Sequence, residues 1–279
     1  MTRRTVADLR ALHAAGERFT VVTAWDRATA EAAEAAGVTA ILVGDSLAQV
    51  ALGHESTVRV GMDEMLHHTA AVVRSTSEAL VIADLPFLSY PDAATAAESA
   101  ARMIRDAGAG AVKLEGGATA APVVEALVRG GAPVVGHIGF TPQSSLIDGR
   151  PRAQGRGAGA ARRLLDDARA LERAGASAIV IELVPAELAA AITERIGIPT
   201  IGIGAGAGCS AQVQVLADLL GLLGGRPPRH ARPYADLRSA AVAAIAAWRS
   251  DVVSGSFPAA EQGISADAAL RAAIDELPR

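Results

Sequence analysis

Short apolar runs alternate with longer Ala- and Leu-rich stretches along most of the chain. The runs are almost uniformly apolar, whereas a one-sided antiparallel strand would alternate apolar and polar positions. They therefore predict strands that are buried on both faces of a parallel sheet. Seven such runs are evident: Phe19–Thr23, Ala40–Val43, Leu80–Ala83, Ala111–Leu114, Ala132–Val135, Ala178–Ile181 and Pro199–Ile203.

The stretches between these runs have the composition and the end signals of helices. Several are followed by Ala-Gly or Gly, as at Gly108 and Gly175, because glycine adopts without strain the left-handed conformation that often ends a helix. The predicted helices are Asp26–Ala36, Met62–Ser75, Asp92–Ala107, Thr119–Arg129, Ala158–Ala174 and Pro185–Ile196.

Strands that alternate with helices in a chain of 279 residues favour an α/β fold, a (β/α)8 TIM barrel, over an open doubly wound sheet. We expect the eighth strand between Val213 and Leu223, where helix and strand signals are mixed. A helix over Val6–Ala15 would cap the floor of the barrel.

The C-terminal part predicts two extra helices, Leu237–Val253 and Ala266–Glu276, packed outside the barrel. No linker rich in Pro, Gly or Ser separates independent domains, and Gly224–Pro233 is at most a hinge into these helices. We therefore predict a single (β/α)8 barrel domain over residues 1–279, with 234–279 as peripheral C-terminal helices.

Composition excludes several classes of partner. A formal net charge of -4 with 3% aromatic residues offers neither the basic field nor the stacking surfaces that nucleic-acid binding needs. The lone Cys209 cannot form an internal disulfide, and Met1–Arg10 lacks the apolar run of a secretion signal, so we expect a cytoplasmic protein. The longest uncharged stretch, Ile196–Ala217, contains Pro199 and several glycines, which suits a strand and a loop better than a membrane span.

Ionisable residues stand at or near the ends of five predicted strands, where a parallel barrel builds its site. A single Asp, such as Asp84, could instead be a helix N-cap. Glu and His are poor N-caps, however, and Lys113 lies within a strand. The set comprises Asp45, Asp84, Lys113, Glu115, His137 and Glu182.

Two aspartates and a glutamate without neighbouring thiolates or paired histidines are hard oxygen ligands, which favour Mg²⁺ or a similar ion over zinc. A 2-oxo acid chelates such an ion, which stabilises the enolate formed when the adjacent carbon loses a proton. Glu182, between Ile181 and Leu183, is the candidate base, because an apolar setting raises a carboxyl pKa toward the working pH. A salt-bridged carboxylate of the barrel is the alternative.

His137 and Lys113 would face the anionic substrate, although a buried histidine can also merely satisfy a backbone carbonyl. Lys113 is the only lysine beside 25 arginines, and a planar guanidinium would not replace a compact ammonium beside a small carboxylate. The Gly202–Gly208 run misses the spacing of a dinucleotide loop and predicts a close-approach loop over the barrel mouth. The Arg226–Arg232 cluster suits a solvated turn or a contact for an anionic cofactor tail.

Seven motifs occur in order between about Phe19 and Pro258. They are Leu42-Val43-Gly44-Asp45-Ser46-Leu47, Gly53-His54-Glu55-Ser56-Thr57, Ala83-Asp84-Leu85-Pro86-Phe87, Val112-Lys113-Leu114-Glu115-Gly116-Gly117, Gly136-His137-Ile138-Gly139-Phe140-Thr141-Pro142-Gln143-Ser144, Ala153-Gln154-Gly155-Arg156 and Gly202-Ile203-Gly204-Ala205-Gly206. Together they resemble the ketopantoate hydroxymethyltransferase family.

The resemblance implies a Mg²⁺-dependent (β/α)8 barrel. Such an enzyme transfers a hydroxymethyl group from 5,10-methylenetetrahydrofolate to 3-methyl-2-oxobutanoate through a metal-stabilised enolate, which gives 2-dehydropantoate for pantothenate biosynthesis. The resemblance also implies a homo-oligomer built from dimers, such as a decamer, with the C-terminal helices as natural interface material.

Matched position by position, Glu182 corresponds to the family's proton acceptor. Asp45 and Asp84 correspond to direct metal ligands, and Glu115 to a ligand that acts through water. The positions that match contacts to the 2-oxo acid or a histidine of the site are Asp45, Ser46, Asp84, Lys113 and His137.

The chain departs from the family where Ser210-Ala211-Gln212 replaces Asp-Gly-Gln and where Ala217-Asp218 replaces His-Asp. Three alternatives therefore stay open. The first is a paralogue that hydroxymethylates a different 2-oxo acid, and the second is a related metal-enolate carbon–carbon lyase or aldolase. The third is a non-catalytic paralogue, which predicts decay at the acidic and lysine positions of the site, and none is seen.

Overall fold

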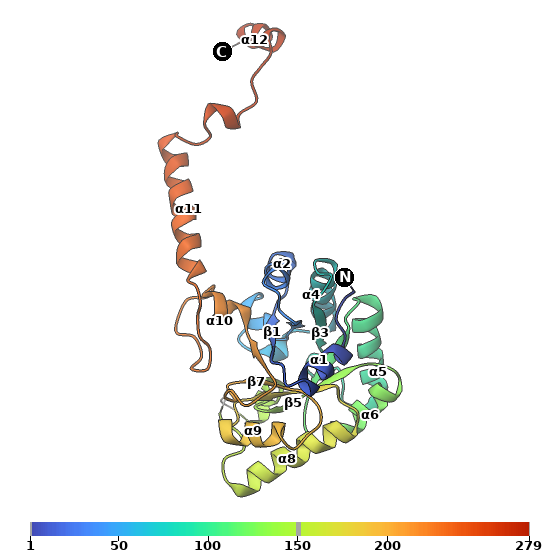
Figure 1. Cartoon of the computed structure of the whole chain (residues 1–279). Coiled ribbons are helices and arrows are strands. Elements are labelled where there is room, and N and C mark those ends of the chain that lie inside the picture. Colours follow the sequence, from blue (N-terminus) through green and yellow to red (C-terminus); the bar gives the residue numbers. More distant parts are fainter. Residues whose placement is uncertain (1, 149–151, 279) are drawn as a thin grey trace.

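A computed structural model describes residues 2–148 and 152–278, and over these residues eight strands close into an all-parallel barrel (Figure 1). Each strand pairs with the next in sequence, and the last pairs with the first. The predicted barrel is confirmed. Its strands are β1 (Phe19–Thr23), β2 (Ala40–Val43), β3 (Leu80–Asp84), β4 (Ala111–Glu115), β5 (Val134–Gly139), β6 (Ala178–Glu182), β7 (Thr200–Ile203) and β8 (Ala211–Gln214).

Helices form a layer outside the barrel, where their apolar faces cover the outward side chains of the strands. The starts of two of them follow from capping, because the Asp26 carboxylate accepts the Thr29 N–H at 2.8 Å and Asp92 accepts two N–H groups of its own first turn. The outer helices are α2 (Arg27–Ala35), α4 (Met62–Arg74), α5 (Ala93–Ala101), α6 (Ala121–Arg129), α8 (Ala158–Arg173) and α9 (Ala186–Thr193), and the shorter ones are α3 (Leu47–Val50), α7 (Ser145–Asp148) and α10 (Leu216–Leu220).

Apolar side chains fill two separate cores, one between the barrel and its helices and one inside the barrel. The N-terminal helix α1 (Val6–Ala14) belongs to the inner core, because its fully buried Leu9 packs with the inward residues Phe19 and Val21 of β1. This helix caps the floor as predicted, so the ionisable residues can gather only at the opposite, carboxyl end.

Two strands differ from their predicted bounds by more than one residue. β5 starts at Val134 because Pro133 has no N–H for the ladder, and it runs on to Gly139, so His137 lies within the strand. β8 begins at Ala211, two residues before the predicted range, and α10 occupies much of the rest. Gln212 and Gln214 alternate with buried residues on β8, so this strand lacks the uniformly apolar run of the others.

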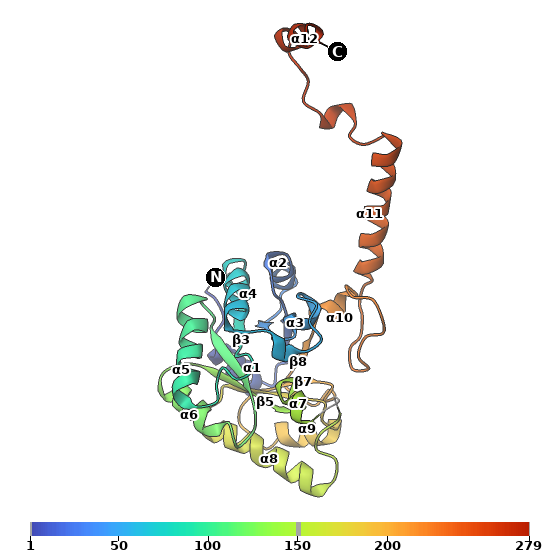
Figure 2. The same ribbon diagram turned by 180° about the vertical axis from the view of Figure 1, so that it is seen from behind.

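The C-terminal helices α11 (Leu237–Ser254) and α12 (Ala268–Asp275) project away from the barrel, as both views show (Figures 1 and 2). The expected packing of these helices outside the barrel is not observed, since no residue of either is buried. Large apolar side chains of α11 stay exposed, among them Ile245 at 63% and Trp248 at 54%. Among the described residues, no helix is long and apolar enough to cross a bilayer.

Candidate active site

Strand register sets the ionisable side chains next to one another at the carboxyl end of the barrel. Asp84 pairs with Lys113 across β3 and β4, and Glu115 pairs with His137 across β4 and β5. Because alternate residues of a strand point to the same side, Lys113 and Glu115 both face the barrel interior. Glu182 ends β6 on the far side of β5.

These side chains line one cavity of about 740 Å³ at the mouth of the barrel. Its volume lies within the range of cavities that hold drug-sized ligands, so it exceeds the needs of a small 2-oxo acid. All seven predicted site residues line it: Asp45, Ser46, Asp84, Lys113, Glu115, His137 and Glu182.

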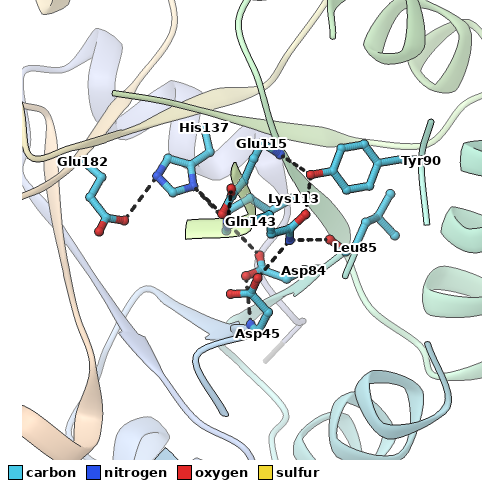
Figure 3. Close-up of polar contacts among 9 residues, drawn as sticks. All are labelled: Asp45, Asp84, Leu85, Tyr90, Lys113, Glu115, His137, Gln143 and Glu182. Carbon is cyan, nitrogen blue, oxygen red and sulfur yellow. Dashed lines mark hydrogen bonds and ion pairs between the residues drawn. The ribbon is translucent and has the colours of Figure 1, made fainter. Parts of the chain in front are cut away.

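A buried ammonium and two buried aspartates form the centre of the site (Figure 3). Lys113 Nζ lies 3.0 Å from Asp84 Oδ1, and the side chains are only 5% and 2% exposed. The backbone N–H of Asp45 donates to Asp84 Oδ2 at 3.0 Å, so one carboxylate holds both the lysine and the turn after β2. The contacts with Lys113 and with the Asp45 N–H together fix the orientation of the Asp84 carboxylate.

Charge is unevenly compensated in this cluster. Burial, and then the charges of Asp84 and Glu115, raise the pKa of Asp45 to about 8. Burial also raises the pKa of Asp84, although Lys113 opposes the change. Burial favours the neutral form of Lys113. The charges of Asp84, Glu115 and Asp45 outweigh this effect and raise the pKa of the lysine above its ordinary value. The cluster therefore has more acidic groups than one lysine can neutralise.

His137 connects the two sides of the site. Its Nδ1 lies 3.5 Å from Glu115 Oε1 and its Nε2 lies 3.3 Å from Glu182 Oε2 (Figure 3). Burial and the Lys113 ammonium disfavour a charge on the ring, but the two glutamates outweigh them and raise the pKa of His137 to about 9. Burial favours the neutral form of Glu115, yet the His137 interaction lowers the pKa of that carboxyl overall.

Two residues that the sequence did not single out hold these acids in place. Gln143 Nε2 donates to Asp45 Oδ2 at 2.9 Å, and its backbone N–H donates to Glu115 Oε2 at 2.9 Å. Tyr90 donates to Gln143 Oε1 at 2.6 Å and accepts the Glu115 N–H at 3.3 Å. Gln143 lies in a quoted motif without an assigned role, whereas no signal in the sequence distinguishes Tyr90.

The site offers oxygens to a cation. Asp84 Oδ1 and Glu115 Oε1 are buried without a hydrogen bond of good geometry, the first in spite of its close lysine. A divalent cation would supply the positive charge that the cluster lacks, and carboxylate oxygens are the ligands that Mg²⁺ prefers. Among the described residues, no three Asp, Glu, His or Cys side chains form a ready-made metal cluster. A cation here would therefore depend on water or substrate oxygens for part of its shell.

A parallel barrel with acid, lysine and histidine side chains at the carboxyl ends of its strands is the architecture of a (β/α)8-barrel enzyme. A protein-family model described as ketopantoate hydroxymethyltransferase matches residues 3–260 of the chain. The chain therefore belongs to the ketopantoate hydroxymethyltransferase family, a family of transferases.

Similar proteins agree with this assignment. The 3-methyl-2-oxobutanoate hydroxymethyltransferase of Chloroflexus aurantiacus is 56% identical over 271 residues, which cover 97% of this chain and 96% of the relative. That of Gluconacetobacter diazotrophicus is 54% identical over 260 residues, 93% and 94% of the two chains. The crystal structure of phosphonopyruvate hydrolase with oxalate and Mg²⁺ has the same fold, with a TM-score of 0.62, 17% identity, and coverage of 99% and 96%.

Removal of the Tyr90 hydroxyl tests the support of the site. Tyr90→Phe leaves Gln143 Oε1 and the Glu115 N–H without their partner in a largely buried setting, so we expect a loss of about 1–2 kcal/mol in the free energy of unfolding, measured in urea. Tyr234→Phe is the matched control, because Tyr234 is 70% exposed and should change by less than about 0.5 kcal/mol. Equal effects of the two substitutions would contradict this role of Tyr90.

Proposed function

We propose that the protein transfers a hydroxymethyl group from 5,10-methylenetetrahydrofolate to 3-methyl-2-oxobutanoate and so forms 2-dehydropantoate for pantothenate biosynthesis. One observation carries this proposal: the carboxylate of Glu182 faces the same cavity as the Asp84–Lys113 pair, with His137 between them. A proton acceptor and an anion-binding cluster thus stand on opposite sides of one cavity. Membership of the family supplies the reaction class.

The residues fit a bound Mg²⁺, with Asp45 and Asp84 as direct ligands and Glu115 as a ligand through water. The support is the excess of buried carboxylates over cations and the two buried oxygens without a hydrogen bond. Mg²⁺, when bound, would supply positive charge against the keto and enolate oxygens of the substrate.

The protein's own residues bind and deprotonate the acid. Asp45 and Ser46, together with Asp84, position the oxo acid, and the Lys113 ammonium stabilises its negative charge. Glu182 removes the proton from C3, and the electron pair left on that carbon forms the new bond to the one-carbon unit. The bonds between that unit and the folate nitrogens break, water supplies the hydroxyl oxygen, and tetrahydrofolate leaves. His137, whose Nε2 lies 3.3 Å from Glu182 Oε2, orients the oxygen that accepts the proton.

Two observations support binding of the folate. The cavity has space beyond that of a 2-oxo acid, and Ser210 and Ala211, where the chain departs from the family, lie outside its lining. Ser210 bonds to His13 of the floor helix at 2.9 Å, and Ala211 belongs to the inner core at the amino end of β8. Neither residue lines the cavity, whereas Asp218 does. The substitutions at 210 and 211 therefore leave the walls around the substrates unchanged. We place the reaction in the cytoplasm, which suits a chain whose only cysteine is a buried free thiol.

Proton exchange without folate tests the enolising half of the reaction. With Mg²⁺ in D₂O, the wild-type protein should remove the C3 proton signal of 3-methyl-2-oxobutanoate from the proton NMR spectrum, and Glu182→Gln should abolish this exchange. Glu187→Gln is the control, because Glu187 is exposed on the next helix. Exchange of other 2-oxo acids but not of this one would show that the acceptor is wrong, and addition of methylenetetrahydrofolate then tests for the hydroxymethylated product.

Lys113→Arg should weaken the binding of the oxo acid although it keeps the charge. The lysine is fully enclosed between carboxylates, and the larger planar guanidinium cannot take the place of the compact ammonium. We expect a loss of at least ~1.4 kcal/mol, about tenfold in Kd, by titration calorimetry with Mg²⁺ present. Lys113→Met, which removes the charge, should bind at least as poorly; unchanged affinity in the arginine variant would contradict the role.

We also propose that the protein is a homo-oligomer built from dimers, in which each C-terminal arm (residues 237–278) packs on a second copy. Exposed apolar residues follow one face of α11, at Val242, Ile245, Trp248 and Val252. A stripe of this kind that is left in water marks an interaction surface. Thr20 on β1 is exposed beside its half-buried neighbour Gln212 on β8, so the barrel also offers an incompletely covered outer face.

Substitutions on the two faces of α11 distinguish this packing from an arm that stays in solvent. The wild-type protein should have a mass of at least two chains of 28.3 kDa by light scattering, and Ile245→Asp with Trp248→Asp should shift it toward one. Ala243→Asp with Ala247→Asp adds the same charge on the opposite face and should keep the oligomer. A monomeric wild-type protein, or the same mass for both variants, would exclude the arm as an interface.

A further inference from the structure

Leu183, the residue directly after Glu182, has a left-handed backbone conformation. Its φ is +49°, and among the described residues only Leu88, at +58°, combines a positive φ with a side chain. The left-handed conformation is unfavourable for residues other than glycine, because the Cβ atom crowds the following carbonyl oxygen. Such a backbone persists only where its surroundings fix it, and residues of this kind are concentrated at functional sites.

The left-handed turn changes the side to which Leu183 points. Val180 belongs to the inner core and Ile181 to the outer core, so alternation along β6 turns Glu182 inward and would turn the next residue outward. Leu183 nevertheless lines the cavity together with Glu182, and Val184 packs in the outer core instead. The turn therefore adds an apolar side chain to the cavity wall immediately after the proposed base.

Backbone hydrogen bonds to three other segments hold this turn. The N–H of Phe140 donates to the carbonyl of Glu182 at 2.8 Å, and the N–H of Gln154 donates to the carbonyl of Leu183 at 2.9 Å. The N–H of Leu183 itself donates to the carbonyl of Ile203 in β7, also at 2.9 Å. The segment after β5, the loop before α8 and β7 thus fix the direction in which the Leu183 side chain points.

Two glycines leave the space that the turn occupies. A Cβ atom at Gly139 would collide with the carbonyl oxygen of Glu182, and one at Gly204 would lie 2.7 Å from Leu183 Cδ2. Both glycines have a positive φ, so a side chain at either position would also be strained. Leu183 stays partly exposed in the cavity, whereas Ile203 on the same wall is buried. Leu183 therefore offers apolar surface that a bound ligand can cover.

We infer that Leu183 is a specificity-determining residue, and the inference rests on the proposed function. Glu182 can remove the proton from C3 of the 2-oxo acid only when that carbon lies at its carboxylate. The groups attached to C3 then meet the apolar side chain that follows the base, and in 3-methyl-2-oxobutanoate these groups are two methyls. Leu183 packs against them, which favours acids branched at C3 and limits the size of the branch.

Competition between two 2-oxo acids for proton exchange tests this selection. 3-Methyl-2-oxobutanoate and 3-methyl-2-oxopentanoate, which carries an ethyl group in place of one methyl, are mixed with the protein and Mg²⁺ in D₂O. Proton NMR follows the loss of both C3 signals, and the ratio of the two rates is independent of the amount of folded protein. One methylene in an apolar pocket changes discrimination about 10- to 200-fold, so Leu183→Ala should shift the ratio about tenfold or more toward the larger acid.

Two further variants separate the side chain from the backbone. Leu183→Gly removes the same side chain and also relieves the left-handed backbone, so it should shift the ratio as far as Leu183→Ala does. Leu88→Ala is the matched control, because Leu88 has the same backbone conformation but is 67% exposed and lies outside the lining of the cavity. This variant should keep the wild-type ratio.

The outcomes distinguish the inference from the proposed function. An unchanged ratio in Leu183→Ala and Leu183→Gly would overturn the inference, although exchange by the wild-type protein would still support the function. A shift in only one of the two variants, or loss of exchange of both acids in either, would also overturn it, because the residue would then act through the backbone or through the base. A wild-type protein that exchanges neither acid would instead contradict the proposed function.

Discussion

The site depends on one electrostatic contact, that of the buried Lys113 ammonium with Asp84. Three carboxylates lie enclosed around this ammonium, and each buried charge without a partner would cost several kcal/mol. Asp84 in turn holds the turn after β2 through the Asp45 N–H, so the same contact orders the loop that carries the next acid. Because a single ammonium cannot neutralise all three acids, the site stays acidic and suited to a divalent cation and a chelating substrate.

The barrel makes this contact possible, since Asp84 and Lys113 come from neighbouring strands and lie opposite each other in register. A shift of one residue would turn every side chain of a strand to its other face and would remove the lysine from the cavity. The floor helix and the inner apolar core fill the other end of the barrel, which leaves only the carboxyl end for polar groups. Gln143 and Tyr90 then reach in from loops and restrict the acids further.

The cavity has two chemically different halves. The acidic half carries groups that suit a small chelating anion, whereas apolar side chains such as Ile203 and Val213 line the other half. The base, Glu182, ends the strand between them and is held through His137. The C-terminal arm follows directly after residues 221–236, of which Pro228 and His230 line the cavity, so an assembly that packs the arms on second copies would also stabilise this segment.

Much of this could be predicted from the sequence, because local patterns carry it. The uniformly apolar runs predicted seven strands, and glycines after the intervening stretches indicated several helix ends. The ionisable residues at the ends of those runs predicted which side chains meet at the barrel mouth. β8 was misplaced because its polar outward glutamines conceal the strand. The roles of Tyr90 and Gln143 were missed because their partners lie 25 to 98 residues away in sequence. Tertiary structure alone decided these contacts and the projection of α11 away from the barrel, since each depends on surfaces that exist only once the barrel has closed.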